Sequence, residues 1–420
     1  MSYLKQIVIK NLTITSVEGD KLATLGENIT TILSIDYHEN IFHPNYRFEI
    51  VFQSVENPFS DLKLRGTEKA SIEIQHGSME ESFEFDDLIL TAFVQNQTES
   101  TANQYTIRLE PEAIVNNEKN RVTKRYSPDV AGSVHIENIL KTQIGVSEDE
   151  IDVEQSVNPV GFYGNYWRPF KALYWIARRS MSASMPEDGG GTDRVGFLFW
   201  QTKSGYKFKS IDTMISESKK GSVFKYVQND ALSDNSNFDI YNPTFEVDQN
   251  IIAQMMNSMY GENRKYFNLH TLQVTDDVAF SKTNAKQAHL GTEDEVKLDF
   301  DINEKPTVPT RNVFMDYTMR KDGTYDDDSK EYNPHKIISQ ARMRYQSLRS
   351  KALKITVPMN LQLEAGDILD IKIIKSMEGT DKWMSGLYII KDLQHSYITR
   401  KNGVQCYTYL RLIKDTPGDD

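Results

Sequence analysis

Cysteine is almost missing from this chain of 420 residues, since Cys406 is the only one. A single thiol cannot form an intrachain disulfide, so stability has to come from buried surface and from association with other chains. The lone cysteine also excludes a Cys-x-x-Cys zinc site, and with it the deaminase chemistry that His135-Ile136-Glu137 would otherwise suggest. A lone thiol fits a protein that assembles in a reducing cytoplasm.

Long apolar runs are missing as well. No stretch approaches the roughly 18 uninterrupted apolar residues of a membrane helix. The first residues, Met1 to Ile7, lack the basic region followed by an apolar segment that a secretory signal needs. We therefore expect a soluble protein that neither spans a membrane nor carries a standard export signal.

Positive charge is in deficit, with 48 Lys and Arg against 60 Asp and Glu and a formal net charge of -12. A dedicated DNA- or RNA-reading surface is normally basic, so this balance argues against that class. The chain is 39% apolar and contains 21 Tyr and 19 Phe, which is too much for a disordered chain. Its length allows about two to four globular domains.

Catalytic motifs are missing too. No glycine is followed by lysine, so there is no phosphate-binding loop. Gly189-Gly190-Gly191 follows a predicted helix and precedes a strand, the reverse of a dinucleotide fingerprint, and is interpreted as a flexible connector. His38 and His43 are five residues apart, whereas the zinc-protease pattern needs four, which favours a surface turn.

Two further candidate sites have weak support. The segment from Asp322 to Glu331 offers carboxylates for calcium, but Asp327 stands where the calcium loop needs glycine, so a solvated hairpin tip is favoured. Carboxylate pairs can act as acid and base from distant positions, and the sequence gives no reason to choose one. We expect no catalytic residues, no cofactor and no metal.

What is present begins with strands. Apolar side chains occupy every second position in short runs of the first hundred residues, the spacing that puts them on one face of a strand. Phe48, Ile50 and Phe52 are an example. Six such strands separated by polar turns are typical of an antiparallel barrel or sandwich. They cover 7–14, 29–37, 46–54, 70–75, 83–94 and 105–109.

The pattern changes near Pro111. Helical spacing fits 129–144, and Pro169 suits the first turn of a helix over 169–184. Two strands, 195–201 and 206–210, follow, which predicts a helix packed on a hairpin. The apolar face of that helix is Phe170, Leu173, Ala177 and Met181.

The rest of the chain returns to strands. The polar, acidic stretch Thr275 to Pro309 predicts a loop-rich insertion that follows a helix starting near Ile251, and Pro334 to Ser350 predicts a further helix. The expected strands are 223–228, 238–247, 352–357, 368–375, 386–397 and 405–412.

The two strand-rich ends contain similar hairpins. Phe85 to Thr91 leads to Tyr105 to Leu109, and Tyr388 to Gln394 leads to Tyr407 to Leu412. A duplication would give two similar barrels. Any two amphipathic hairpins also look alike, so the sequence leaves both interpretations open.

Basic residues gather at three places. The simplest interpretation is solvated helix and loop faces, and contact with an acidic partner protein is the alternative. The clusters are Arg121 with Lys124 and Arg125, Arg178-Arg179, and Arg342 with Arg344, Arg349 and Lys351.

Two blocks of sequence resemble a known family. The first is Tyr166 to Ser180 (YWRPFKALYWIARRS), followed by Val195 to Gln201 and Ile211 to Ile215. The second is the helix from Pro334, the Leu361 to Asp367 turn with its Ala-Gly-Asp, and the strand Ser385 to His395. In this order they resemble the baseplate central hub protein of contractile-tailed (T-even-type) bacteriophages, a relative of the base of type VI secretion spike proteins. The acidic segment from Thr275 and the triple glycine depart from that family.

The resemblance implies a mixed, mainly β (α+β) fold with two similar antiparallel, tube-like β-barrels and α/β insertions. The first barrel would cover 1–112, and an α/β domain with the helix 169–184 would cover 113–218. The second barrel would combine 219–248 with 312–416, and 249–311 would be a helix plus the acidic insertion.

The implied function is structural rather than enzymatic: a homotrimer that joins a six-fold tail tube to a three-fold, cell-puncturing spike. Its implied partners are the spike protein, which in this family can carry a cell-wall hydrolase, tail tube or tube-initiator proteins, and the tape measure protein. DNA would pass transiently through its channel, and a negative charge would suit such a conduit. The protein would be assembled in the host bacterial cytoplasm and would end in the virion baseplate.

A closed ring of subunits removes exposed strand edges. The residues that we expect at paired edges between subunits are Ile7, Ile9, Tyr105, Ile107, Ile389, Tyr407 and Tyr409. The alternative hypothesis, based on the aromatic content and the many carboxylates, is an all-β carbohydrate-binding or glycan-cleaving tail protein.

Overall fold

The computed structural model describes most of the chain. Of the described residues, 53% lie in strands and 21% in helices, so the expected mainly β class is confirmed. The described residues are 7–16, 21–25, 30–55, 66, 68–76, 82–98, 102–183, 194–220, 223–228, 238–246, 251–259, 261–268, 272–274, 278–281, 288–291, 310–314, 334–349, 351–375, 379–400 and 403–416. The triple glycine and the Asp322 to Glu331 segment lie outside them.

Seven strands form the first strand set, in the order β2-β1-β5-β6-β7-β4-β3 with antiparallel neighbours. Alternation along each strand explains them: in β4, Phe48, Ile50 and Phe52 are buried, whereas Arg47 and Glu49 are partly exposed. The strands are β1 (Ile7–Thr15), β2 (Lys21–Thr24), β3 (Thr30–Asn40), β4 (Arg47–Ser54), β5 (Lys69–His76), β6 (Ser82–Thr98) and β7 (Asn103–Pro111).

Six strands form the second strand set, and their pairing closes into a ring. The order β23-β20-β13-β14-β19-β24 returns to its start because β24 pairs with both β19 and β23. The strand β13 runs parallel to both of its neighbours, β14 and β20. The strands are β13 (Phe224–Gln228), β14 (Asp239–Glu246), β19 (Lys351–Pro358), β20 (Ile368–Lys372), β23 (Gly386–Arg400) and β24 (Gly403–Lys414).

The two strand sets share one thirteen-stranded sheet, because β3 pairs antiparallel with β23. We call this junction the β3–β23 seam. Side chains of both sets, such as Phe48 and Leu410, pack in one apolar core. The structure therefore has two strand sets, one of them closed into a ring, that are continuous through the seam. The division into two similar barrels stays a prediction.

Both hairpins of the suspected repeat are present. β6 pairs antiparallel with β7, and β23 pairs antiparallel with β24. The duplication itself stays a prediction.

The part of the chain that lies between the two strand sets in the sequence has its own apolar core, which contains residues from Val122 to Phe208 and which we call the α/β core. The helix α4 contacts β11 of the hairpin β11–β12, as the sequence predicted, and Leu173 and Phe199 are both buried there. The elements are α2 (Glu112–Lys119), β8 (Arg125–Tyr126), α3 (Gly132–Ile139), the π-helix η1 (Leu140–Ile144), the 3-10 helix η2 (Glu148–Glu150), β9 (Ile151–Val153), β10 (Phe162–Tyr163), α4 (Pro169–Ala177), β11 (Phe197–Thr202), β12 (Gly205–Ser210) and α5 (Ile211–Lys220).

The helix α4 is shorter than predicted, since it ends at Ala177 and not at 184. The amide of Asn158 explains the early end: it donates to the carbonyl of Arg179 at 2.6 Å and accepts from the N–H of Met181 at 2.7 Å. These bonds hold the chain in an extended course, and Met181 pairs in an isolated bridge with Val195.

The predicted helix near Ile251 is present as α6 (Ile251–Met256). The segment after it contributes to a four-stranded sheet of β15 (Gly261–Asn268), β16 (Gln273–Val274), β17 (Val278–Ser281) and β18 (Thr310–Phe314). Among the described residues, β17 is the one strand within the stretch 275–309 that was predicted to be loop-rich. The strands of this sheet are short, and β15 has no alternating apolar pattern, so periodicity does not reveal them. The predicted helix from Pro334 is confirmed as α7 (Pro334–Ser347). A two-stranded sheet is formed by β21 (Ile374–Lys375) and β22 (Gly379–Thr380).

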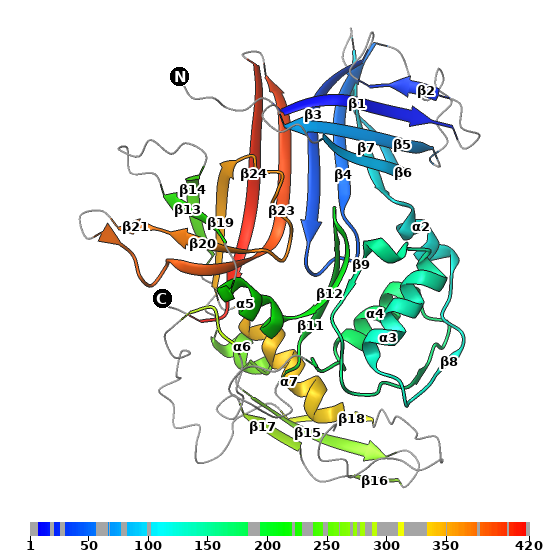
Figure 1. The fold of residues 1–420 in the computed structure, drawn as a ribbon, viewed down its shortest axis with the longest axis vertical. Coiled ribbons are helices and arrows are strands. Elements are labelled where there is room, and N and C mark those ends of the chain that lie inside the picture. The colour runs from blue at the N-terminus through cyan, green and yellow to red at the C-terminus, as the bar shows by residue number, and fades with distance from the viewer. Residues whose placement is uncertain are drawn as a thin grey trace.

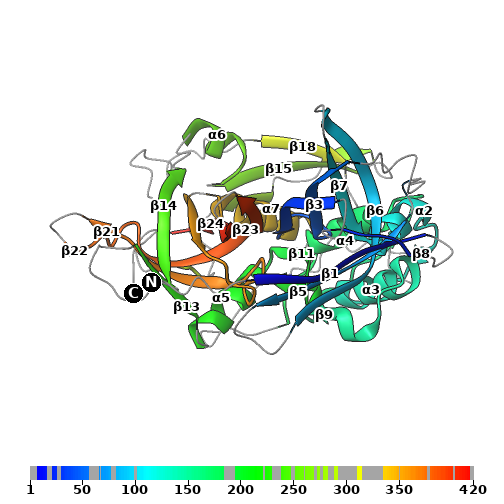
Figure 2. The same ribbon diagram turned by 90° about the horizontal axis from the view of Figure 1, so that it is seen from above.

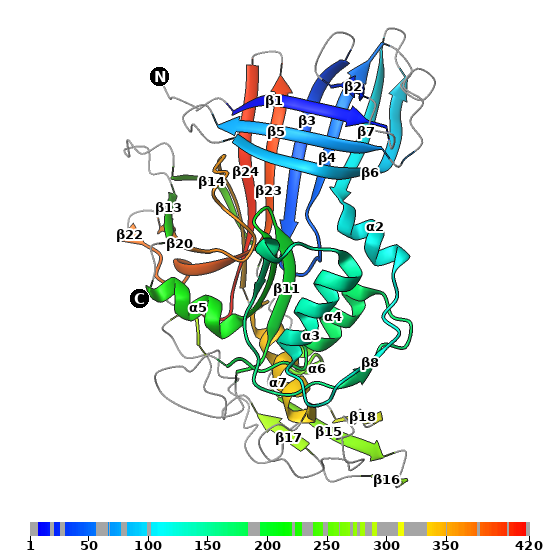
Figure 3. The same ribbon diagram turned by 45° about the vertical axis from the view of Figure 1, so that its right-hand side comes forward.

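The arrangement in space places the parts around the long strands. β1, β5 and β6 run across the long strands β3, β4, β23 and β24 (Figures 1 and 3). α5 and α7 lie below these strands, and β15 to β18 lie at the far end (Figure 1). Seen from above, α2 and α3 lie at one end of the molecule and β21 and β22 at the other (Figure 2).

Candidate functional site

A polar surface covers the outer face of the long strands and crosses the β3–β23 seam. We call it the polar face. Its members alternate along each strand with the core residues and form three cross-strand rows, and all of them except the buried Ser396 are at least partly exposed. The rows are Arg108-Glu49-Asp36-Ser396, Arg47-His38-Gln394-Tyr409-Thr356 and Asn40-Asp392-Arg411-Lys354.

Side-chain bonds connect the polar face across the seam. Gln394 Nε2 donates to Asp36 Oδ1 at 3.0 Å, and the Ser396 hydroxyl donates to the same oxygen. The Asn40 amide donates to Asp392. Because three bonds join β3 to β23 on this face, the seam is fixed by side chains as well as by the backbone ladder.

A groove of about 770 Å³ lies over the polar face. It runs from the β3–β4 turn to β14 and β19, so both strand sets contribute to its lining. Lining residues include His43, Asn45, Asn242, Lys354, Gln394 and Tyr409.

Charges on the polar face are balanced. Arg108 and Glu49 form an ion pair at 2.9 Å, and Arg411 and Glu246 form another at 2.8 Å. The described charged residues are the acids Asp36, Glu49, Glu110, Glu246 and Asp392 and the bases Arg47, Arg108, Lys354 and Arg411. The net charge of -12 is therefore not concentrated on this face.

A buried carboxylate joins three parts of the chain. Glu39, on β3, is 2% exposed, and its Oε1 accepts from the Tyr37 hydroxyl at 2.6 Å and from the N–H of Lys203 at 2.9 Å. Its Oε2 accepts from the N–H of Ala365 at 2.6 Å. Lys203 belongs to the β11–β12 turn and Ala365 to the turn before β20, so Glu39 connects both strand sets with the α/β core.

Burial governs the ionisation of the titratable groups around Glu39. It raises the pKa of Glu39 to about 7, although the hydrogen bonds from Tyr37 and Ala365 oppose the rise. Burial likewise raises the pKa of Asp367 to about 6 and lowers the pKa of His395 to about 3. Near neutral pH these groups therefore hold fewer charges than their types suggest.

The two sequence blocks that carried the resemblance meet beside Glu39. Trp200 Nε1 donates to the carbonyl of Ala365 at 2.8 Å. Gly366 has φ +98, and a Cβ there would lie 2.6 Å from the Trp200 ring. Only glycine fits this turn, because both the backbone conformation and the indole require it.

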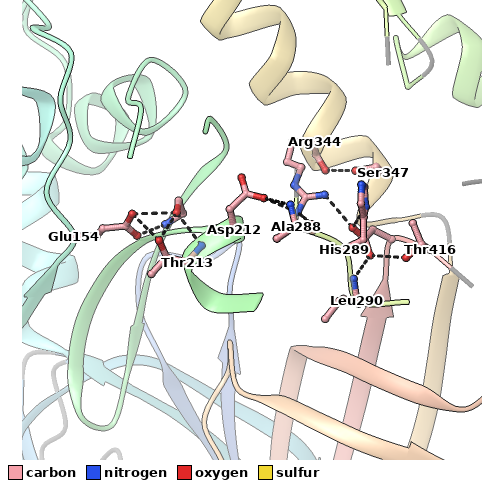
Figure 4. A network of polar contacts seen from close by, with 11 residues as sticks. Glu154, Asp212, Thr213, Ala288, His289, Leu290, Arg344, Ser347 and Thr416 are labelled. Atoms are coloured by element: carbon pink, nitrogen blue, oxygen red, sulfur yellow. Dashed lines mark hydrogen bonds and ion pairs between the residues drawn. The ribbon is translucent and has the colours of Figure 1, made fainter. Parts of the chain in front are cut away.

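A buried ionic network lies between the last turn of α7 and the first turn of α5 (Figure 4). Arg344, on α7, is fully buried and pairs with Asp415 at 2.9 Å and with Asp212 of α5 at 3.1 Å. It also donates to the carbonyl of Ala288. Asp415 further accepts from the N–H of Leu290 at 3.0 Å, so the network fastens the 288–291 segment between α5, α7 and the end of β24.

The two carboxylates of this network ionise differently. Burial opposes the charge of both. At Asp415 the hydrogen bond with His289 and the charge of Arg344 prevail and hold the pKa well below its usual value. At Asp212 burial prevails and raises the pKa, because fewer groups bond to it.

The residues predicted at strand edges have mixed locations. Tyr105, Ile107 and Ile389 are buried in the core, and their strands β7 and β23 are paired on both sides, so they are not at strand edges. β24 is also paired on both sides at Tyr407 and Tyr409, yet Tyr409 is 37% exposed on the polar face and Tyr407 is partly exposed. Ile9 is partly exposed, and among the described strands β1 pairs there only with β5, because its pairing with β2 covers Thr13 to Thr15. The side chain of Ile7 lies outside the described residues. Contact with another subunit stays a prediction for all seven.

Sequence reasoning missed the most connected residues. Arg344 was assigned to a solvated face, and Lys351 with it, but both are buried. Glu39 and Asp415 were not singled out. The only signal in the sequence was the position of Arg344 on the apolar face of α7, at helical spacing from Ile337 and Ala341.

The described residues contain no group of three or more His, Cys, Asp or Glu side chains that could hold a metal ion. Within the same part of the chain, no helix is long and apolar enough to cross a membrane. His135 is buried and bonds to the carbonyl of Ser127 at 3.1 Å, and burial lowers its pKa.

The fold is that of phage tail proteins. The tail protein from Neisseria meningitidis MC58 superposes with a TM-score of 0.55 and 11% identity, over 97% of this chain and 96% of that one. The 43 kDa tail protein of prophage MuSo2 from Shewanella oneidensis superposes with a TM-score of 0.54 and 9% identity, over 96% and 98%. No family model and no curated protein matches the sequence.

Proposed function

We propose that this chain is the central hub of a contractile phage tail baseplate. The observation that carries the proposal is the polar face, which runs without interruption over both strand sets of a fold that phage tail proteins share. The two sequence blocks that resemble hub proteins support it, because they pack against each other through Trp200 and Ala365.

In this proposal the hub is a homotrimer, and each subunit contributes two similar barrels to a six-fold-like ring. The first barrel is 1–112 and the second combines 219–248 with 312–416, while 113–218 and 249–311 are inserted domains. The closed ring of the second strand set and the similar hairpins β6–β7 and β23–β24 support this division.

The polar face would line the conduit. Acids and bases alternate on it, so the phosphates of DNA meet no continuous basic surface that would retain them. The ring would join tail tube or tube-initiator proteins and the tape measure protein on one side to the spike on the other. The protein would act in the virion tail after assembly in the host cytoplasm.

The decisive experiment is the mass of the purified chain in solution, alone and with the spike protein of the same phage, followed by electron microscopy of the complex. We expect a trimer that binds the spike and shows three-fold symmetry with a six-fold-like ring. A strict monomer that binds neither spike nor tube proteins would contradict the proposal.

A further inference from the structure

A tight turn in the α/β part presents two tyrosines to solvent. In Gly164-Asn165-Tyr166-Trp167 the N–H of Trp167 donates to the carbonyl of Gly164 at 2.9 Å, and the central residues have φ 45 and φ 57. This is the type I′ pattern, in which glycine is favoured at the position held by Tyr166. The turn is fixed in place, because a Cβ on Gly164 would lie 2.2 Å from the carbonyl oxygen of Val122.

The left-handed backbone of Tyr166 is a strained conformation for a bulky residue. Burial of the side chain offsets little of that strain, since Tyr166 is 76% exposed. Tyr163, three residues earlier, is 63% exposed. Strain of this kind clusters at functional sites. The strained, exposed tyrosine therefore marks this turn as a candidate contact site for another molecule.

Cations surround the turn. The guanidinium of Arg125 lies 5.8 Å from the Tyr163 ring centre, Lys171 Nζ lies 5.2 Å from that of Trp167, and the Arg179 guanidinium lies 3.7 Å from that of Trp175. We call this the aromatic–basic patch. It consists of Arg125, Tyr163, Tyr166, Trp167, Lys171, Trp175 and Arg179.

The patch has the opposite charge to the rest of the molecule. Segments 118–129 and 162–179 contain eight basic residues and two acidic ones, in a chain whose net charge is -12. One of the two acids, Glu118, is already paired with Arg168 at 2.9 Å. The basic residues are Lys119, Arg121, Lys124, Arg125, Arg168, Lys171, Arg178 and Arg179.

We propose that the aromatic–basic patch docks an acidic segment of a partner protein. Tyrosine, tryptophan and arginine are the residue types that dominate binding energy at protein interfaces, and the charge of the patch selects an acidic partner. A single-stranded nucleic acid fits less well, because stacking of bases needs free aromatic faces and cations already lie over three of these rings. The proposal goes beyond the hub function and does not depend on the trimer.

The test uses random dodecapeptides displayed on a particle and selected on the immobilised full-length chain. We expect enrichment of peptides rich in Asp and Glu. Binding of the enriched peptides should weaken at least about ten-fold in Tyr166→Gly and in Arg125→Glu, as expected for the loss of one interface contact. The glycine variant should also melt at the same or a higher temperature, because glycine relieves the left-handed strain at this position.

Matched controls are Ile252→Ser, which removes an apolar side chain that is 71% exposed on α6, and Lys372→Glu, which reverses an exposed charge on β20. Neither should change peptide binding. Enriched peptides without acids, or equal binding by patch and control variants, would overturn the proposal. So would a labelled oligothymidine that binds the wild type and not the patch variants, or a Tyr166→Gly chain that loses self-association in sedimentation.

Discussion

Glu39 and Ala365 are separated by 326 positions in the sequence and joined by a hydrogen bond of 2.6 Å between the carboxylate and a backbone N–H. The same carboxylate accepts two further bonds, from Tyr37 and Lys203. One buried side chain thus fixes the positions of the two strand sets and the α/β core relative to one another.

Replacement of Glu39 by Ala should lower the free energy of unfolding by about 3 kcal/mol, because three buried donors lose their acceptor. Urea denaturation measures this change. Glu84→Gln, an exposed carboxylate on β6, is the control and should change stability by less than about 0.5 kcal/mol. Equal effects of the two variants on the free energy of unfolding would contradict the stabilising role of the hydrogen bonds to Glu39.

The pH dependence of stability should change as well. Burial raises the pKa of Glu39 to about 7, above the ordinary 4.5, so the folded state binds more protons than the unfolded state between these values. Stability therefore falls as pH rises from about 4.5 to about 7. Asp367 adds a fall of the same sign up to about pH 6. Denaturation curves of Glu39→Gln across this range should show a smaller fall than those of the wild type.

Removal of Arg344 should be strongly destabilising. Arg344→Met leaves Asp212 and Asp415 buried without their cation, which costs about 3–5 kcal/mol. Hydrogen exchange of the 288–291 backbone should accelerate, because Leu290 and Ala288 bond to the same network. Arg349→Met, an exposed position just beyond α7, should do neither.

The contribution of Asp415 to stability should depend on pH in the acid range. The pKa of Asp415 is held below its ordinary 3.8, so its contribution is present above that pH and is lost as the pH falls further. Adding Asp415→Asn to Arg344→Met should recover part of the stability, because an unpaired charge is removed. No recovery in melting experiments would argue against the ionic nature of this contact.

A charge in the core under α4 should abolish soluble protein. Leu173 and Ala177 are 0% and 2% exposed between the helix and the β11–β12 hairpin, and an aspartate at either position would be buried without a partner. Expression and melting temperature of Leu173→Asp measure this effect. Val134→Asp, on the exposed side of α3, is the matched control and should give normal yield.

The balance of charge on the polar face predicts how it treats DNA. Replacing Glu49 by Gln and Asp392 by Asn leaves bases in excess there, so retention of duplex DNA at low salt should rise above that of the wild type and fall again with added salt. Fluorescence anisotropy measures the binding. Glu84→Gln with Asp86→Asn, two exposed acids on β6, changes the net charge equally and should leave DNA binding low. Equal DNA binding by both double variants would show that the net charge of the protein, and not the charge balance of the polar face, determines DNA binding.

The sequence by itself determined the local structure. Alternating apolar residues such as Phe48, Ile50 and Phe52 specify strands, and the spacing of Phe170, Leu173 and Ala177 specifies a helix, because these periods reflect backbone geometry that each segment has on its own. The two blocks with resemblance to hub proteins also lay in the sequence, and they lead to the fold that the structure has.

Only the tertiary structure decided which distant residues meet. The β3–β23 seam, the ring of the second strand set and the course of the chain after Ala177 depend on pairings between segments that no local period encodes. Arg344 illustrates the reason: an arginine on a helix is compatible with solvent until Asp212 and Asp415, far away in the sequence, make its burial favourable. The strained Tyr166 is likewise visible only in the backbone, because the sequence gives its identity and the fold alone gives its left-handed conformation.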